Sequence, residues 1–356
     1  DILRSVLRDG AERPEIEVLP GWLPAISVET WSDAAIERFF GLPLEPSAAL
    51  PARVAIFRKT GDEHEVCLHQ HHFFTDGISL SIFWKEVITR YLGAAVPGPG
   101  PTFEEYCRSV DRWLESESGR ASRSYWRQKL RGAQPTRLPL DYPRTEPADF
   151  RGEHVGMRVE SGVLAGIDEF CRRESVTRFS VLLWALARSV HQETGQDDVL
   201  VSTFQANRAL PGFQRAFDVV GPVIEEQVLR CRIDAEKSPG EQLLETHETV
   251  TESMAHSSVP VMYLRESGEC PIPPTAVSLV YQSFVSPGDL TAGPLKLRLR
   301  EAIGFGKGHA SFELELVLWP VGDELLGVAA FSTQVFRRST VERILSRFYG
   351  ALAEVS

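Results

Sequence analysis

The chain has 356 residues, 43% of them hydrophobic, and a formal net charge of -11. This length exceeds one ordinary hydrophobic core and predicts two domains or one fold with two lobes. The acidic excess argues against nucleic acid as the main partner, because phosphate binding needs a clustered basic surface. The sequence shows neither an apolar run long enough to cross a membrane nor a signal-peptide pattern, so we expect a cytoplasmic protein.

The first part of the chain alternates predicted strands and helices around a histidine-rich segment. Period-two alternation predicts strands over residues 53–59 and 66–71, which the turn Gly61-Asp62 joins into a hairpin. Apolar residues at helical spacing predict three helices, over residues 32–40, 78–92 and 103–130. The third helix is expected to break at Gly119.

A proline-punctuated run over residues 135–147 separates the two halves, since such a run neither continues a helix nor fills the centre of a sheet. It predicts an N-terminal lobe over residues 1–145 and a C-terminal lobe over residues 146–356. In the second half, helices are expected over residues 162–173, 179–194, 240–255 and 340–355, and strands over 199–204, 225–233, 276–284, 295–302, 311–319 and 325–331. This mixed order predicts an α/β (mixed α+β) architecture in two lobes.

The scattered cysteines give no support to a disulfide framework or a zinc site. They are odd in number and never form a C-x-x-C pair. We expect reduced, mostly buried thiols, as in proteins of the cytosol. The cysteines are Cys67, Cys107, Cys171, Cys231 and Cys270.

The segment His71-His72-Phe73-Phe74-Thr75-Asp76-Gly77 lies where a predicted strand meets a predicted helix. A neutral imidazole can take a proton from an amine or alcohol that attacks a carbonyl. Adjacent histidines at a strand end point to opposite faces, so one would face a cleft and the other would be structural. Asp76 would either orient His72 or hold the loop, and Gly77 would open the following helix. The residue types alone leave catalytic and structural roles equally open.

Other chemical interpretations have less support. A metal site would use His69, His71, His72 and Asp76, but no further cluster supplies a ligand at recognisable spacing, so no metal is expected. The glycine-rich residues 304–308 lack the G-x-x-x-x-G-K-[ST] spacing of a phosphate loop. No G-x-S-x-G motif supports a serine nucleophile of the hydrolase type.

The histidine segment resembles the His-His-x-x-x-Asp-Gly signature of the condensation domains of non-ribosomal peptide synthetases. These domains are related to acyltransferases with the chloramphenicol-acetyltransferase-like fold. Further segments are similar to the family pattern and occur in the same order: Leu3-Arg4-Ser5-Val6, Ser124-Tyr125-Trp126, residues 138–144, residues 195–199, Ala206-Asn207-Arg208, Val220-Gly221-Pro222 and residues 256–260. The resemblance therefore covers nearly the whole chain.

The resemblance implies a pseudo-dimer of two chloramphenicol-acetyltransferase-like lobes with a central tunnel. A carrier protein would present the acyl or aminoacyl donor as a thioester on its phosphopantetheine arm, and an amine acceptor would form an amide with it. No cofactor or metal would belong to the chain itself, which would be a monomeric domain or part of a multidomain synthetase for an antibiotic or other secondary metabolite. The alternatives are an ester-forming or small-molecule acyltransferase of the same fold and a non-catalytic recruitment domain.

The resemblance also implies residue roles. His72 would face the tunnel centre and either take a proton from the attacking amine or position that amine. The backbone amide of Gly77 would lie near the reacting thioester. His71 and Asp76 would support the motif structurally, with Asp76 paired to Arg4, because a buried carboxylate needs such a partner.

The sequence departs from the family pattern at three places, one of which is Val261 in place of the phenylalanine expected after Pro260. The pattern extends several dozen residues before the position of Arg4, so the first strand and helix of the N-terminal lobe are expected to be missing. Where the family has an asparagine near the acceptor side of the site, this chain has Glu225. Strand alternation would place Glu225 and Gln227 on one face and Glu226 on the other. Glu225 is then either a solvent-facing edge residue or a negative charge for a cationic or unusually polar acceptor.

Overall fold

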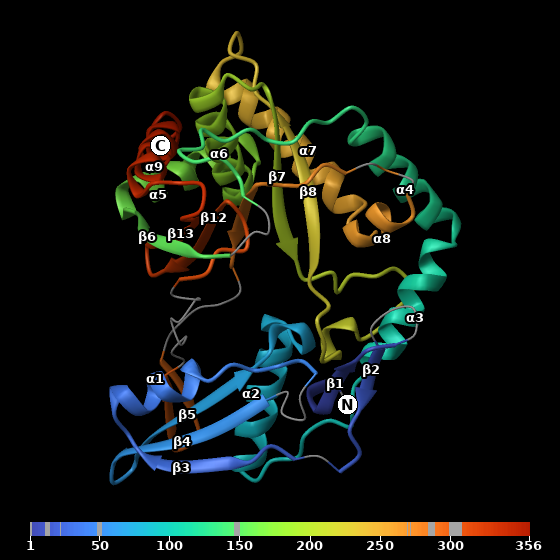
Figure 1. The fold of residues 1–356 in the computed structure, drawn as a ribbon, viewed down its shortest axis with the longest axis vertical. Helices are drawn as coiled ribbons and strands as arrows, with labels where there is room; N and C mark the ends of the chain where they lie inside the picture. Colours follow the sequence, from blue (N-terminus) through green and yellow to red (C-terminus); the bar gives the residue numbers. More distant parts are fainter. Residues whose placement is uncertain are drawn as a thin grey trace. The chain divides into compact units, whose positions relative to one another are not determined.

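The computed structural model describes residues 2–10, 15–21, 23–47, 52–145, 150–268, 270, 272–283, 289–298 and 308–356. By its internal contacts the chain divides into two units (Figure 1). Unit 1 comprises residues Asp1–Glu115 and Ala206–Ile224, and unit 2 comprises residues Ser116–Gln205 and Glu225–Ser356.

This division differs from the boundary that the sequence predicts between residues 145 and 146. That boundary lies inside unit 2, which begins at Ser116, and residues 206–224 return to unit 1. A proline-rich run marks irregular backbone, but it carries no information about the unit against which the flanking chain packs. The two units therefore do not coincide with the two lobes that the sequence predicts.

Unit 1 contains a three-stranded sheet with the order β3-β4-β5. Strand β3 runs parallel to β4, and β4 and β5 form the predicted antiparallel hairpin. Helix α1 covers one face of this sheet with Ala35 and Phe39, which pack on Phe57 and Cys67. The described elements of unit 1 are η1 (Ile2–Arg4), β1 (Ser5–Arg8), β2 (Glu15–Val18), β3 (Ile26–Thr30), α1 (Asp33–Gly41), β4 (Ala52–Thr60), β5 (Glu63–Gln70), η2 (His72–Phe74), α2 (Gly77–Tyr91), α3 (Phe103–Leu114) and η3 (Ala216–Asp218).

Unit 2 is built on a six-stranded mixed sheet with the order β6-β13-β12-β9-β7-β8. Alternate strand residues, such as Val201 and Leu316, form one hydrophobic core with helices α5, α6, α7 and α9, so these helices cover a single face. Strands β10 and β11 form a separate hairpin. The described elements of unit 2 are α4 (Glu117–Lys129), β6 (Gly152–Val159), α5 (Ser161–Glu174), α6 (Arg178–Thr194), β7 (Asp198–Gln205), β8 (Glu225–Arg232), α7 (Pro239–Ala255), α8 (Val261–Glu266), β9 (Val277–Tyr281), β10 (Asp289–Ala292), β11 (Leu295–Arg298), β12 (Leu314–Val321), β13 (Glu324–Ser332) and α9 (Arg338–Ala353).

The helix predicted over residues 103–130 is two helices, α3 and α4, and its break is not at Gly119. The break is at Glu115 and Ser116, where unit 1 passes into unit 2. Ser116 caps α4 because its hydroxyl accepts the N–H of Gly119 at 3.1 Å. Gly119 therefore lies in the first turn of α4, whose N-cap is Ser116.

Several other expectations are tested directly. The mixed α/β architecture is confirmed. The five cysteines are free thiols, and Cys67, Cys231 and Cys270 are buried. In the described part of the chain, no helix is both long and apolar enough to cross a membrane. The glycine-rich segment at residues 304–308 lies largely outside the described residues, which resume at Gly308.

Gly327 provides a test of the sheet packing in unit 2. A β-carbon at this position would overlap the carbonyl oxygen of Val317 on the neighbouring strand. We expect Gly327→Ala to lower the free energy of unfolding by about 2–3 kcal/mol through overpacking. Gly156→Ala on the adjacent strand is the control, since nothing lies within 4 Å of its added β-carbon. Urea unfolding measures the free energy of unfolding of both variants. Equal values for the two variants would contradict this packing.

Candidate functional site

The histidine segment is the turn between strand β5 and helix α2, and it contains the short helix η2. Phe74 is 1% exposed, so its buried ring anchors this turn. The amide of Gln70, the last residue of β5, donates to the hydroxyl of Thr75 at 2.9 Å. The turn is therefore held to the end of the strand from which it leaves.

Asp76 is a buried helix cap with an ion-pair partner. Its carboxylate accepts the N–H of Ser79 at 2.8 Å, which caps α2. Nη2 of Arg208 lies 2.8 Å from both carboxylate oxygens. The side chain of Arg208 is 0% exposed and that of Asp76 is 3% exposed. The N–H of Val223 donates to the same carboxylate at 3.1 Å.

Arg208 extends this network to the loop over residues 206–224. Its Nη1 donates to the carbonyl oxygens of Ala216 and Val219 at 2.9 and 2.6 Å. The phenol of Tyr106 on α3 donates to the carbonyl of Asn207 at 2.8 Å. The loop thus belongs to unit 1 because its buried polar groups find their partners there.

Ser79 joins the cap to the same loop. Its hydroxyl lies 2.7 Å from Asp76 Oδ1 and 2.9 Å from the carbonyl oxygen of Gly221, and one hydrogen serves one of these acceptors at a time. The hydroxyl also accepts the N–H of Gly221 at 3.0 Å. A β-carbon on Gly221 would overlap the ring of Phe103, which explains a glycine at this close approach.

The expected ion pair between Asp76 and Arg4 is wrong, because Arg208 is the partner of the carboxylate. Arg4 lies in η1, and its carbonyl oxygen accepts the N–H of Leu19 at 2.9 Å. The sequence contains a signal for Arg208, since Ala206-Asn207-Arg208 matches the family pattern. The pattern does not reveal which of two distant arginines reaches the buried carboxylate.

The two histidines of the segment differ in their contacts. Nδ1 of His71 accepts the N–H of Phe73 at 3.1 Å, so the neutral ring carries its proton on Nε2. Burial lowers the pKa of His71, and the neighbouring charge of His72 adds to this effect. The side chain of His72 is exposed, and it has no hydrogen-bond partner among the described residues. The imidazole of His71 therefore caps the turn, whereas that of His72 is available to a reactant.

Gly77 is the first residue of α2 and has a helical backbone. The first N–H groups of a helix lack acceptors within the helix, so the N–H of Gly77 remains available to an external oxygen. The carbonyl of Gly77 accepts the hydroxyl of Ser81 at 3.1 Å. Together, His72 and the start of α2 present a base and a hydrogen-bond donor on one short segment.

The metal interpretation of His69 has no geometric support. In the part of the chain that the structure describes, no group of three or more His, Cys, Asp or Glu side chains is placed to hold a metal ion. The ring of His69 lies 6.0 and 5.5 Å from those of Phe39 and Phe40, and burial lowers the pKa of His69. His69 is therefore a neutral side chain packed against the apolar face of α1.

Glu225 is the first residue of β8, in unit 2. Burial raises the pKa of Glu225 to about 7, and the adjacent charge of Glu226 contributes. Its neighbours in the strand differ in their partners, since Gln227 donates to the carbonyl oxygen of Ser257 at 3.1 Å and Glu226 pairs with Arg265 at 2.9 Å. The partial burial of Glu225 does not fit a solvent-facing edge.

The chain is similar to a family model and to known proteins. A family model described as "Condensation domain" matches residues 23–356. Chondramide synthase cmdD from Chondromyces crocatus is 28% identical over 334 residues, which cover 89% of this chain and 8% of that protein. Nonribosomal peptide synthetase TES from Alternaria alternata is 28% identical over 313 residues, which cover 83% of this chain and 6% of that protein. The chain thus spans a small part of the length of both relatives.

Solved structures agree with the fold. The X-domain from teicoplanin biosynthesis superposes with a TM-score of 0.83 at 19% identity, over 99% of this chain and 83% of that chain. The predicted fold of chloramphenicol-acetyltransferase-like lobes is confirmed by this likeness. The resemblance drawn from the sequence motifs is confirmed by the family match.

The buried ion pair of Asp76 gives a stability prediction. We expect Arg208→Met to lower the free energy of unfolding by about 3–5 kcal/mol, because the carboxylate would stay buried without its cation. Arg8→Met removes an ion pair whose side chains are 50% and 51% exposed, and it should cost less than about 1 kcal/mol.

A double variant, Asp76→Asn with Arg208→Met, separates the ion pair from general damage to the core. It should be more stable than Arg208→Met alone, since it removes the uncompensated charge. Urea unfolding followed by tryptophan fluorescence and circular dichroism measures all four proteins. A loss below about 1 kcal/mol in Arg208→Met would contradict the role of this pair.

Proposed function

Because the chain belongs to the condensation-domain family of non-ribosomal peptide synthetases, we propose that it forms an amide bond between an acyl or aminoacyl donor and an amine acceptor. The donor is a thioester on the phosphopantetheine arm of a carrier protein, which is the partner of this chain. The observation that supports the proposal best is the intact histidine segment, in which Asp76 is tied inward and His72 is exposed without a partner.

In the proposed reaction, the amine nitrogen attacks the thioester carbonyl carbon. The carbon–nitrogen bond forms, the carbon–sulfur bond breaks, and the pantetheine thiol leaves with the proton that the amine loses. Thioester aminolysis is already downhill, so the protein mainly supplies proximity, orientation and proton management. The pantetheine arm belongs to the carrier, and no cofactor of the chain itself takes part.

Two groups of the histidine segment act in this proposal. His72 either takes the proton from the attacking amine or holds that amine in position. The N–H of Gly77 donates to the carbonyl oxygen, on which negative charge develops during attack. His71 and Asp76 support the segment, through the contact of His71 with the N–H of Phe73 and the capping of α2 by Asp76. Arg208, rather than Arg4, anchors this support.

We expect His72→Ala to lower amide formation by at least about a hundredfold, because general acid–base catalysis contributes on this order. The assay supplies a carrier protein loaded with acyl-pantetheine and a panel of amines, and intact-mass spectrometry measures the product. His72→Gln keeps a hydrogen-bonding side chain but cannot accept a proton at neutral pH. Activity of His72→Gln well above that of His72→Ala indicates positioning of the amine, and equal losses indicate proton transfer.

The same panel includes alcohols, since an ester-forming acyltransferase of this fold would use them. Product from alcohols but not from amines would replace amide formation with ester formation. His71→Asn is the matched control, because it changes the neighbouring ring while His72 remains. Undiminished turnover in His72→Ala would overturn the assignment of His72, and absence of product with every acceptor in the wild type would favour a recruitment domain.

We also propose that Glu225 selects the acceptor. The family pattern has an asparagine at this position, so Glu225 adds a carboxylate where relatives have a neutral amide. With a pKa of about 7, the carboxylate fraction rises from roughly a tenth at pH 6 to roughly nine tenths at pH 8. A second, protonated amine on the acceptor would pair with this carboxylate and keep it ionised.

The selectivity for a cationic acceptor should therefore increase with pH. We expect the ratio of rates with 1,4-diaminobutane and butylamine to rise severalfold between pH 6 and pH 8 in the wild type. In Glu225→Asn the ratio should stay lower and change much less over the same range. Competition between the two amines, measured by mass spectrometry at each pH, cancels every effect of pH that is common to both acceptors. The same pH response in both proteins would contradict this role of Glu225.

A further inference from the structure

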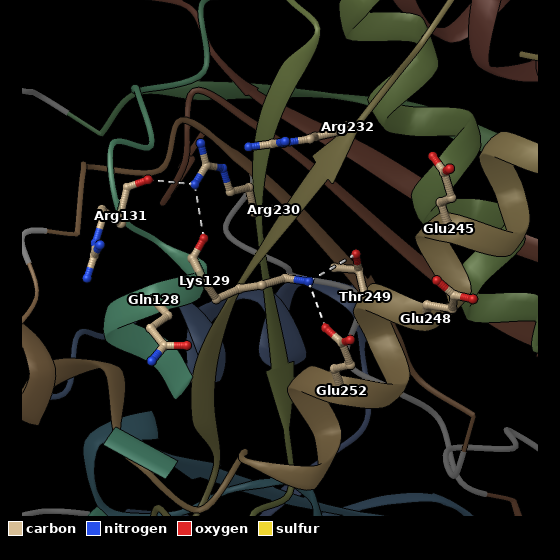
Figure 2. A pocket seen from close by; sticks show the side chains of 9 residues that line it. All are labelled: Gln128, Lys129, Arg131, Arg230, Arg232, Glu245, Glu248, Thr249 and Glu252. Carbon is tan, nitrogen blue, oxygen red and sulfur yellow. Dashed lines mark hydrogen bonds and ion pairs between the residues drawn. The ribbon is translucent and has the colours of Figure 1, made fainter. Parts of the chain in front are cut away.

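Unit 2 contains a groove over strand β8 that the proposed reaction does not use (Figure 2). Its volume is about 540 Å³, and it is lined by the end of α4, the last residues of β8 and the outer face of α7. Arg230 and Arg232 come from the strand, and all residues of this groove belong to unit 2. We call it the β8 groove.

Strand β8 is an edge strand, because it is the last in the order of the six-stranded sheet. Leu200 is the β7 partner of Arg230, and its N–H and carbonyl bond the hydroxyl of Thr136 instead of β8. The N–H of Ile233 donates to the carbonyl oxygen of Asp197, which lies opposite it. Hydrogen-bonded and non-hydrogen-bonded pairs alternate along an antiparallel ladder, so Arg232, like Arg230, belongs to a non-hydrogen-bonded pair. The backbone N–H and carbonyl groups of Arg230 and Arg232 therefore face away from β7.

These outward groups lie at the strand residues that line the β8 groove. Within the described ranges, the backbone groups of Arg230 and Arg232 form no hydrogen bond. The side chain of Arg230 is fully engaged, since it pairs with Asp198 and donates to the carbonyl oxygens of Lys129 and Arg131. It holds the end of α4 beside the strand, so the groove has a fixed wall (Figure 2).

The two sides of the groove carry opposite charges. Arg131 lies at the end of α4 and Arg232 on the strand beside Arg230, whereas the glutamates of α7 line the other side (Figure 2). Glu252 pairs with Lys129 at 2.9 Å, and Glu245 pairs with Lys237. Among the described residues, the side chains of Arg131, Arg232 and Glu248 form no ion pair.

We propose that the β8 groove binds an extended acidic peptide segment that adds a strand to the edge of β8. Its backbone hydrogen-bonds the outward groups of Arg230 and Arg232, as in other cases of strand addition. Successive residues of an added strand point to opposite faces. The side chains of one face meet Arg131 and Arg232, which selects carboxylates at alternate positions. The side chains of the other face meet α7, where Glu248 excludes further negative charge.

Charge complementarity favours this occupant over a basic peptide. Arg131 and Arg232 offer two unpaired cations to one face of the segment, whereas Glu248 offers one unpaired carboxylate to the other. The whole chain is acidic, with a formal net charge of -11, whereas this edge presents two arginines without an ion pair among the described residues. Edge strands of natural proteins are usually blocked, and here the charged walls restrict which segment can pair.

A labelled peptide of alternating glutamate and threonine, four repeats long, is the probe. Fluorescence anisotropy with the wild-type chain should show saturable binding that weakens with salt. The corresponding lysine–threonine peptide should bind at least about tenfold more weakly. Arg131→Glu should weaken binding of the acidic peptide by about tenfold. Arg172→Glu is the control and should leave binding unchanged, because Arg172 is an exposed residue of α5 outside the groove.

The variant Arg232→Pro isolates the contribution of the backbone to binding. The N–H of Arg232 does not take part in the ladder with β7, so Arg232→Pro removes the outward donor and leaves that ladder intact. Arg232→Ala removes the same charge and keeps the N–H. We expect Arg232→Pro to bind the acidic peptide several times more weakly than Arg232→Ala.

A second probe needs no variant, which keeps the test valid where the proline variant fails to fold. An acidic peptide N-methylated at every second amide, on the edge that would pair with β8, should lose binding to the wild type. Equal binding of the methylated and unmethylated peptides would overturn strand addition, and so would equal binding by Arg232→Pro and Arg232→Ala. No saturable binding of the acidic peptide at low salt would overturn the proposal as a whole.

Discussion

The interior of unit 1 depends on one buried ion pair, between Asp76 and Arg208. A charged pair without solvent is stable only when its remaining hydrogen-bonding groups are satisfied. Here the carboxylate also accepts the N–H groups of Ser79 and Val223, and the guanidinium donates to two loop carbonyls. This requirement explains why residues 206–224 return to unit 1 although the chain around them belongs to unit 2.

In the proposed function, the same pair separates support from chemistry within the histidine segment. Asp76 has its hydrogen-bonding capacity used inside the protein, so it does not form a dyad with His72. His71 is occupied by the turn that it caps. His72 is exposed on the same turn, and its imidazole has no hydrogen-bond partner among the described residues. A fixed backbone and a free imidazole are what a reaction limited by orientation requires.

Unit 2 shows a different use of a partly buried charge. Arg230 fastens the end of α4 to strand β8 through Asp198 and two carbonyls, and its own side chain is thereby unavailable to a ligand. The backbone of the same strand keeps its outward hydrogen-bonding groups. At Arg230, the side chain therefore stabilises the fold, whereas the backbone takes part in the proposed recognition.

The sequence by itself determined the mixed α/β fold, the positions of most elements and the family, because periodicity and motif spacing are local or ordered along the chain. It also located the histidine segment and the exchange to Glu225. Only the tertiary structure decided that Arg208 rather than Arg4 holds Asp76, that the units divide at Ser116, and that Glu225 titrates near pH 7. Each of these depends on burial and on contacts between residues far apart in the chain, which no local pattern records.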